Sequence, residues 1–412
     1  RMWSTIHTWS SLAAIAGVYG ISLATTVQGF DSAELTVGAY TLGLVHPTGY
    51  PLYMLIGHLA AQLPLGEVGF RLNLLSVVLG LASVGMFYLL LSAQTKSALP
   101  AATAAILYGL APHVWSQSIK AEVYTLHTLL VVSVMLFRYL ADRKDKPALA
   151  ILYFAILGLA SANHATSILL GVALLLSTDW QDARWRAYSI LGIGVGACCA
   201  LLLYLYFPWR AGQPTAINYI FEYFGRDPRQ PADLLWLVSG QAFRCAVKPA
   251  WGFSELLAQI IRLGAFLWDG SMGLAPLLGI WGWKTLQTTA PRWNRLLGIY
   301  FLGNLAFFLV YQVVDKEAMF LPFYLIMDLW IAQGILAFVH WLPAHVNRLT
   351  RYHAHLFTNL ALLTILGIGA MLDWSALDLS QEHQVYQYAS QVLQDSPPGA
   401  IIVNHWATAS VF

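Results

Sequence analysis

The sequence predicts an all-α polytopic membrane protein with about eleven transmembrane helices. Of its 412 residues, 58% are apolar and only 10% are charged, whereas roughly 25% are charged in a typical soluble domain. Apolar runs of about 18 to 22 residues recur, which is the length that crosses a hydrocarbon core of roughly 30 Å as a helix. The net charge of +2 indicates neither nucleic acid nor an acidic macromolecule as a partner.

The predicted spans follow one another along the chain. They cover residues 10–28, 72–92, 99–115, 122–140, 148–162, 165–177, 187–207, 262–283, 296–314, 320–341 and 354–372. The spans 148–162 and 165–177 are short for a bilayer, so we expect them to be tilted, broken or paired. Residues 50–63 are shorter still and contain His58 and Gln62, which predicts an interfacial segment.

Lysine and arginine in the short loops predict the orientation, because such residues favour the cytoplasmic side. One set of loops carries Lys96, Arg143, Lys144, Lys146, Arg184, Arg186, Lys284, Arg292, Arg295, Arg348 and Arg351. The opposite, outer face then receives residues 29–71, 208–261 and 373–412, and we expect any chemistry there.

The composition changes after Asp373, where polar residues replace the apolar runs. Residues 381–395, the turn at 396–399 and residues 400–403 predict helix, turn and strand. We interpret 1–372 as a transmembrane domain and 373–412 as the beginning of a truncated soluble outer α/β domain. The first residue, Arg1, and the apolar end of the chain suggest a fragment.

Asp31 and Glu34 follow the first span directly and lie three residues apart, which places them on one face of a helix. One of them could act as a general base. The alternative is a capping box, with Asp31 as N-cap and Glu34 at the third helical position. The two interpretations are not exclusive.

Further polar residues lie in the outer segments. His46 stands in a loop that Pro47, Gly49 and Pro51 make rigid, either to position a group or as a plain turn. Arg71 lies where a helix enters the membrane from outside, which suits an anion such as a lipid phosphate. The alternative is that its side chain snorkels to water or forms a salt bridge to Glu67. Other polar candidates are Lys120, Glu122, Asn163, His164, Arg210 and Lys316. No Cys/His set has zinc spacing, and His353 and His355 point to different sides of a helix.

The order of these motifs resembles the transmembrane O-mannosyltransferase-like family, within the GT-C class of membrane glycosyltransferases. The motifs are Asp31 with Glu34, the stretch from His46 to Tyr53, Arg71 to Asn73, Ala121 to Tyr124, Ala162 to His164, and Phe320 to Pro322. They extend over nearly the whole chain. Thr48 departs from the family, which usually has a second proline there; this slightly weakens the case for a rigid loop but affects no reactive group.

The resemblance implies transfer of mannose from a polyprenyl-phosphate donor to a hydroxyl, such as Ser or Thr of an exported protein. It implies a bacterial inner membrane or endoplasmic reticulum membrane, with the site on the extracytoplasmic side. Asp31 is then the base, with Glu34 as its partner or as the base itself. No metal or other cofactor is indicated, although a divalent metal is possible. The expected substrate contacts are His46, Tyr50, Tyr53, Arg71, Asn73, Lys120, Glu122, Tyr124, Asn163, His164, Arg210 and Lys316.

A flippase for lipid-linked sugars or a small-molecule transporter is the alternative, because it would have a similar hydropathy profile. Such proteins place ionisable residues at mid-bilayer along a path. Here only Asp328 and Asp269 have that position, whereas the other candidates lie at the outer surface. The pattern favours the transferase.

Overall fold

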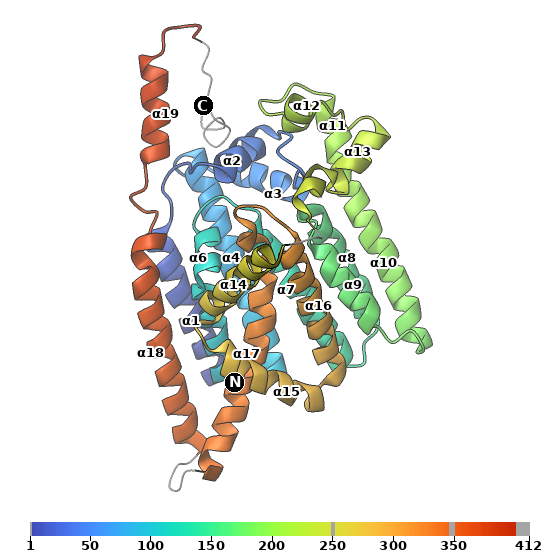
Figure 1. Ribbon diagram of the computed structural model, residues 1–412, viewed down its shortest axis with the longest axis vertical. Coiled ribbons are helices and arrows are strands. Elements are labelled where there is room, and N and C mark those ends of the chain that lie inside the picture. The colour runs from blue at the N-terminus through green and yellow to red at the C-terminus, as the bar shows by residue number, and fades with distance from the viewer. Residues whose placement is uncertain (1, 249–251, 346–350, 401–412) are drawn as a thin grey trace.

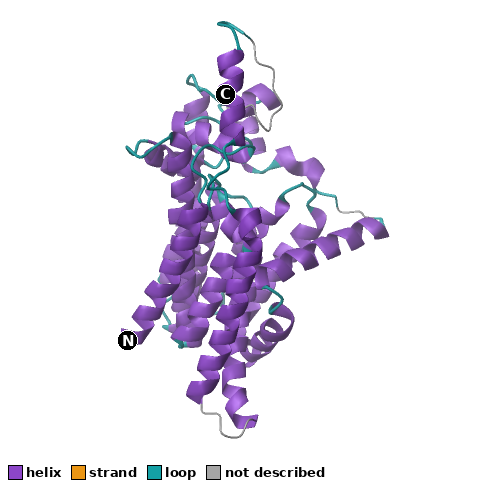
Figure 2. Ribbon diagram, turned by 90° about the vertical axis from the view of Figure 1, so that its left-hand side faces the viewer, coloured by secondary structure: helices purple, strands orange, loops and turns teal. Residues whose placement is uncertain are grey.

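The computed structural model describes residues 2–248, 252–345 and 351–400. Within these ranges the chain is helical and forms no β-strand, and its β-type pairing consists of two isolated bridges, Leu44 with Asn218 and Val247 with Tyr311. The long helices run side by side as a bundle, and Figure 2 shows the same all-helical arrangement from the side. The predicted helical class is confirmed.

Twelve helices in the described part of the chain form the body of the bundle. They are α1 (Met2–Ser22), α4 (Val68–Thr95), α5 (Ala98–Leu110), α7 (Tyr124–Arg143), α8 (Leu149–Asn163), α9 (Ser167–Ser177), α10 (Ala183–Tyr204), α14 (Phe253–Ser271), α15 (Ile280–Thr289), α16 (Pro291–Val310), α17 (Pro322–His345) and α18 (Arg351–Leu377). Between α14 and α15 the chain makes the short π-helix η2 (Ala275–Gly279) and bends by 90°.

Short helices occupy the connections at one end, which is the upper end in Figure 1. They are α2 (Asp31–Thr41), α3 (Pro51–Ala61), α6 (Pro112–Ser118), α11 (Tyr206–Ala211), α12 (Tyr219–Phe224), α13 (Pro231–Val238), η1 (Gln241–Ala246) and η3 (Lys316–Phe320). The loops with lysine and arginine before α10 and α16 lie at the opposite end. The loops rich in lysine and arginine before α10 and α16 and the short connecting helices therefore lie at opposite ends of the bundle.

The predicted number of eleven spans is not confirmed. Each predicted segment overlaps a helix or a helix pair, but among the described residues only six helices are long and apolar enough to cross a membrane, or seven if the bent pair α14–α15 is one span. The described part of α1 and the helices α5, α8 and α9 are apolar but shorter. The hydropathy of the sequence predicts where the helices lie. Several helices are shorter than predicted because the chain breaks within a predicted span, as at Ala111–Pro112 between α5 and α6. Several long apolar helices make the chain an integral membrane protein.

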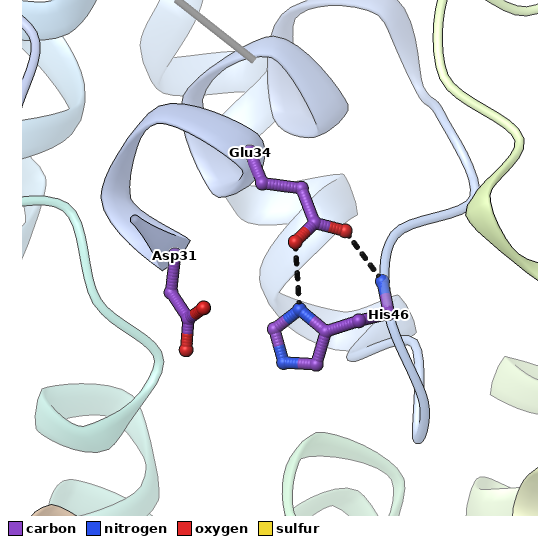
Figure 3. A group of neighbouring side chains, drawn as sticks. All are labelled: Asp31, Glu34 and His46. Carbon is purple, nitrogen blue, oxygen red and sulfur yellow. Dashed lines mark hydrogen bonds and ion pairs between the residues drawn. The ribbon is translucent and has the colours of Figure 1, made fainter. Parts of the chain in front are cut away.

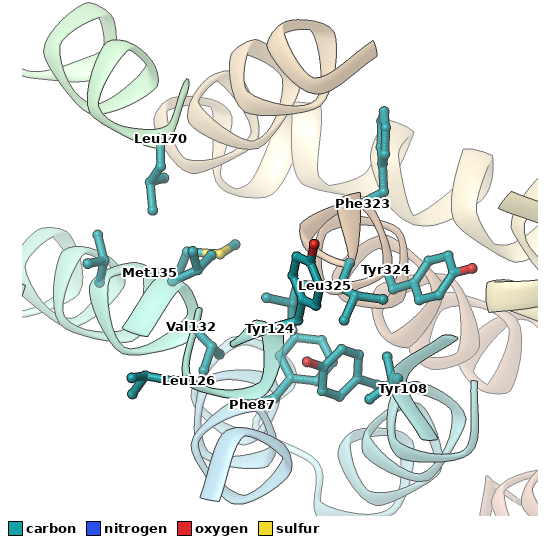
Figure 4. Packing of buried hydrophobic residues seen from close by; sticks show 14 of the residues in the cluster. Phe87, Tyr108, Tyr124, Leu126, Val132, Met135, Leu170, Phe323, Tyr324 and Leu325 are labelled. Carbon is teal, nitrogen blue, oxygen red and sulfur yellow. The ribbon is translucent and has the colours of Figure 1, made fainter. Parts of the chain in front are cut away.

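Small residues allow the closest helix contacts. Gly192 and Gly196 of α10 are four residues apart and lie against the backbone of α8 at Ala150 and Phe154. A Cβ at either glycine would collide with that backbone. Close approach through small residues spaced by four is a common way for membrane helices to pack. The core of the bundle is rich in aromatic side chains, including Phe87, Tyr108 and Tyr124 (Figure 4).

After α18 the helix predicted over 381–395 forms as α19 (Gln384–Asp395), and a turn follows in which Gly399 has φ 82°. The strand predicted at 400–403 lies, from residue 401 on, outside the described residues. The helix and the turn are thus present, and the soluble α/β domain stays a prediction.

Candidate active site

The acidic pair stands at the start of α2. Asp31 is the first helical residue, and it follows Phe30, whose backbone φ of 58° is unusual for a non-glycine residue. Neither carboxylate caps the helix, since Phe30 is the N-cap and makes no side-chain cap hydrogen bond. The capping-box alternative is therefore wrong. Strained backbone of this kind occurs preferentially at functional sites.

Glu34 is bound by His46 at two points (Figure 3). The His46 backbone N–H donates to Glu34 Oε1 at 2.6 Å, and His46 Nδ1 lies 2.9 Å from Glu34 Oε2. Glu34 is 1% exposed. The Glu34 carboxylate thus holds the histidine loop against α2 and is already fully engaged.

The histidine loop is rigid, as predicted. Gly49 N–H donates to the His46 carbonyl at 2.9 Å, and the φ of 85° at Gly49 favours glycine. A Cβ at Gly49 would also run into the ring of Phe207. On its far side, His46 Nε2 lies 2.9 Å from the Tyr50 hydroxyl. The loop therefore positions His46 between Glu34 and Tyr50.

His46 carries a positive charge at neutral pH. Burial lowers the pKa of His46, but the hydrogen bond and the negative charge of Glu34 outweigh it and raise the pKa to about 9. In this state both ring nitrogens are donors, so Nδ1–H donates to Glu34 and Nε2–H donates to Tyr50. The site thus contains a fixed cation.

Asp31 is the open carboxylate of the site. Among the described residues nothing donates a hydrogen bond to it, and Figure 3 shows it beside His46 with no hydrogen bond to His46 or Glu34. Burial raises the pKa of Asp31, the charge of His46 lowers it, and the charges of Glu34 and Asp315 raise it further. A carboxylate with a raised pKa and free lone pairs is suited to accept a proton.

Asp31, Glu34 and His46 also form the kind of cluster that can hold a metal ion, because one ligand atom from each lies within 4.8 Å of the others. Both oxygens of Glu34 and both ring nitrogens of His46 are, however, already in hydrogen bonds to protein groups. A metal would have to replace these bonds. The arrangement fits a hydrogen-bonded acid–histidine pair better than a metal centre.

Lys120 and Glu122 form the opposite edge of the site, in the loop between α6 and α7. Lys120 Nζ lies 3.5 Å from Glu122 Oε1, and the Lys120 side chain is 29% exposed. Burial raises the pKa of Glu122 to about 7, against the lowering effect of Lys120. Asn73 fixes this loop, because its Oδ1 accepts from Ala121 N–H at 2.8 Å. Asn73 is therefore a positioning residue and not a substrate contact.

Aromatic rings form a wall beside the charged groups. The Tyr50 and His164 rings stack with centroids 6.2 Å apart, and Tyr124 lies 5.5 Å from His164. Burial lowers the pKa of His164 to about 4, so this histidine is neutral. Asn163 donates to the Val123 carbonyl, and the Tyr53 hydroxyl is buried without a hydrogen-bond partner. The structure thus places these predicted residues close to the loops of the site.

Three cations that were predicted as substrate contacts have partners within the protein. Arg71 donates to the carbonyls of Leu65, Ala61 and Gly66 at 2.9, 2.6 and 2.7 Å. Arg210 donates to the carbonyls of Leu42 and Thr41. Lys316 is fully buried and donates to Gln259 Oε1 and to the carbonyls of Phe308 and Tyr311. These cations hold backbone segments together, which corrects the role predicted for them.

Arg71→Ala is expected to lower thermal stability and to leave donor affinity unchanged, because the guanidinium binds three carbonyls of the α3–α4 connection. The loss should be on the order of 1 kcal/mol, since the three acceptor carbonyls are exposed or only partly buried and water can replace the lost donors. Thermal unfolding and a donor-binding titration measure the two quantities. A weakened donor affinity with normal stability would mean that Arg71 binds the donor.

Glu34→Gln is expected to change the pH profile. If transfer needs His46 protonated, activity is present below its pKa and is lost as the pH rises through about 9. Gln removes the charge that raises this pKa, so the alkaline limit of kcat/KM should fall by about two units or more. The pH dependence of kcat/KM in both proteins measures this shift. An unchanged alkaline limit would mean that the protonation of His46 does not set this limit.

Two groups near the site were not assigned from the sequence. Tyr219 has its ring centroid 6.4 Å from His46, and the charge of Asp315 acts on Asp31. Tyr219 is brought there by pairing between distant segments, since its N–H donates to the Leu44 carbonyl at 2.7 Å. Nothing local in the sequence indicates that pairing.

Solved structures with the same arrangement of helices belong to membrane glycosyltransferases of the GT-C class. The oligosaccharyltransferase of Archaeoglobus fulgidus, in its apo form, superposes with a TM-score of 0.60 at 14% identity, over 95% of this chain and 58% of that chain. ArnT of Cupriavidus metallidurans, in the apo state, gives 0.62 at 14% identity, over 99% and 84%. At these identities the likeness shows the fold.

The sequence matches are more specific. Residues 31–187 match the family model of the Protein O-mannosyl-transferase TMEM260 N-terminal domain. The mouse (Mus musculus) Protein O-mannosyl-transferase TMEM260 is 27% identical over 232 residues, which are 52% of this chain and 33% of that protein. The Dictyostelium discoideum relative is 24% identical over 121 residues, 29% of this chain and 15% of that protein. The resemblance to the O-mannosyltransferase-like family is confirmed, and the chain spans about a third of the mouse relative.

Proposed function

We propose that this protein is a membrane glycosyltransferase that transfers mannose from a polyprenyl-phosphate donor to a hydroxyl of an exported protein, such as that of Ser or Thr. The observation that carries the proposal is the open Asp31 carboxylate, which has a raised pKa and lies beside the protonated His46. The names of proteins similar to this chain are consistent with this proposal. Two are protein O-mannosyl-transferases, and one structure is that of ArnT bound to undecaprenyl phosphate.

Asp31 acts as the general base in this proposal. It takes the proton of the acceptor hydroxyl while the hydroxyl oxygen forms a bond to C1 of the sugar. The bond between C1 and the phosphate oxygen breaks, and the lipid phosphate leaves with the electron pair. Attack opposite to the leaving group inverts the configuration at C1. Glu34 acts through His46 as a positioning residue, because both of its oxygens accept hydrogen bonds from it.

Lys120 holds the donor phosphate in this scheme, and His46 adds its positive charge without donating to the phosphate, because both of its ring N–H groups are engaged with Glu34 and Tyr50. Lys120 is the partly exposed cation of the site, and its ion pair with Glu122 is long at 3.5 Å. Arg71, Arg210 and Lys316 have their donors on backbone carbonyls and are not needed for this task. The negative charge that develops on the leaving phosphate is stabilised by fixed positive groups.

The predicted outer side of the membrane belongs to the same proposal. The site lies at the end of the bundle opposite to the arginine- and lysine-rich loops, and those loops favour the cytoplasm. A lipid-linked donor in the outer leaflet would then present its phosphate to the loops that carry His46 and Lys120.

The test is incubation of the purified protein with a panel of labelled polyprenyl-phosphate sugars and a Ser/Thr-rich acceptor peptide. Label transferred to the peptide from the mannose donor supports the proposal. Label that crosses a vesicle membrane while it stays attached to its lipid would identify a flippase instead. Asp227→Asn is a matched control, because Asp227 is an acid paired with the exposed Arg229 outside the site.

Transfer is expected to need no divalent metal, because Glu34 and His46 already satisfy each other. Treatment with EDTA should leave the initial rate of transfer unchanged. If the rate falls and added Mn²⁺ or Mg²⁺ restores it, the cluster of Asp31, Glu34 and His46 holds a cation.

A further inference from the structure

A polar cavity lies at the end of the bundle away from Asp31. Helix α9 starts next to His164 at the site and ends at Ser177, where the cavity begins. The cavity has a volume of about 410 Å³ and lies where α7, α9, α10 and α16 meet, at the lower ends of α9 and α10 in Figure 1. Volumes of this size are typical of small-ligand sites.

Arg138 of α7 is the buried cation of this cavity. It is 2% exposed, lies 5.2 Å over the ring of Trp185, and forms an ion pair with Asp142. Its Nη2 donates to the Ser177 carbonyl at 3.3 Å, but its Nε has no hydrogen-bond partner. Oδ2 of Asp142 also lacks one. Buried polar groups without partners are costly, so a ligand that reaches Arg138 and Asp142 from the cavity would satisfy both a donor and an acceptor.

Arginines are in excess over carboxylates here. Arg292 and Arg295 of α16 line the same cavity, which also contains Asp142 and Asp179. Arg292 Nη2 pairs with Asp179 Oδ2 at 3.0 Å, whereas the exposed Arg295 has no partner among the residues that the structure describes. Three arginines against two carboxylates leave one positive charge. Arginine is the side chain that best matches a phosphate.

The surface next to the cavity is apolar. Leu176 lines the cavity and is 62% exposed, and Val172, one turn along α9, is 46% exposed. On α10, Ile190 is 59% exposed. A ligand with a phosphate in the cavity would therefore have a surface for an acyl chain directly beside it, which a free phosphate ion would not use.

We propose that this cavity binds the headgroup of an anionic phospholipid, with the phosphate on Arg138 and Arg295 and a headgroup hydroxyl on Asp142. Basic pockets between membrane helices are a known setting for anionic headgroups. The site is independent of the sugar-transfer site, and its occupancy needs no donor or acceptor. Its expected effect is to hold the ends of α7, α9, α10 and α16 together.

The experiment is a lipid titration of the delipidated, detergent-solubilised protein, followed by native mass spectrometry and thermal unfolding. Phosphatidylglycerol should bind at least about tenfold more tightly than phosphatidylcholine and raise the melting temperature. Arg295→Gln should weaken phosphatidylglycerol binding by about tenfold or more, the effect of one charge-assisted contact. Arg295 is exposed, so Arg295→Gln is expected to fold. Arg138 is buried, and Arg138→Gln could fail to fold, which is why Arg295 is the position tested.

Arg143→Gln is the matched control, because Arg143 ends the same helix as Arg138 but does not line the cavity. It should keep phosphatidylglycerol affinity. An equal loss in Arg143→Gln and Arg295→Gln would overturn the proposal in favour of diffuse surface attraction. Stabilisation by millimolar inorganic phosphate equal to that by phosphatidylglycerol would overturn the lipid assignment and leave a site for the free ion.

Discussion

Asp31→Asn is expected to lower kcat by about 10² to 10⁴, the usual contribution of a general base. Asparagine keeps the shape of the side chain but cannot take the proton of the acceptor hydroxyl. The wild type should also lose activity as the pH falls through the raised pKa of Asp31, because only the carboxylate form accepts a proton. Single-turnover rates with saturating labelled donor measure the chemical step.

Donor affinity and melting temperature are the internal controls for this variant. Both should stay close to wild type, because Asp31 accepts no hydrogen bond within the described structure and replacing it leaves no donor unpaired. Near-normal turnover in Asp31→Asn, together with its loss in Glu34→Gln at every pH, would make Glu34 the base.

Lys120→Ala is expected to weaken donor binding by about one to two orders of magnitude. A hydrogen bond to a charged group contributes roughly 1.5 to 3 kcal/mol, and each 1.4 kcal/mol is about tenfold in affinity. Lys120 can turn to a phosphate at little cost, because its contact with Glu122 is long and its side chain is 29% exposed. Equilibrium binding of the labelled polyprenyl-phosphate sugar measures the effect.

Lys248→Ala is a suitable comparison, since Lys248 is an exposed lysine and only its backbone N–H donates to the Val310 carbonyl at the end of α16, a bond that alanine keeps. It should bind donor as the wild type does. An equal loss in both variants would mean that Lys120 acts only through the overall positive potential and holds no phosphate.

The acid pair and the histidine loop could be predicted from the sequence because their chemistry is local. Asp31 and Glu34 lie on one helical turn, and the prolines and glycine around His46 fix the loop without distant partners. The sequence could not show that Glu34 would accept two hydrogen bonds from His46. That contact decides against the capping box and distinguishes the two acids.

The roles of two arginines and a buried lysine could not be predicted from the sequence. Arg71, Arg210 and Lys316 stand in outer segments, where an anionic substrate is a reasonable partner for each. Their actual partners are mainly backbone carbonyls, some of them distant in sequence, such as Leu42 for Arg210. Exposed charge and structural charge look the same in a sequence, and only the tertiary fold separates them.

Helix α9 has one more consequence, for the membrane itself. Its 11 residues give a helix of roughly 16 Å, about half of the roughly 30 Å hydrocarbon core. Ile168 and Leu176, near its two ends, are 66% and 62% exposed, so lipid lies against this short helix. A hydrophobic length below the bilayer thickness is accommodated by local thinning or by polar groups that reach up from the ends. Beside α9, a phosphate headgroup therefore has less hydrocarbon beneath it than beside a helix that crosses the full core.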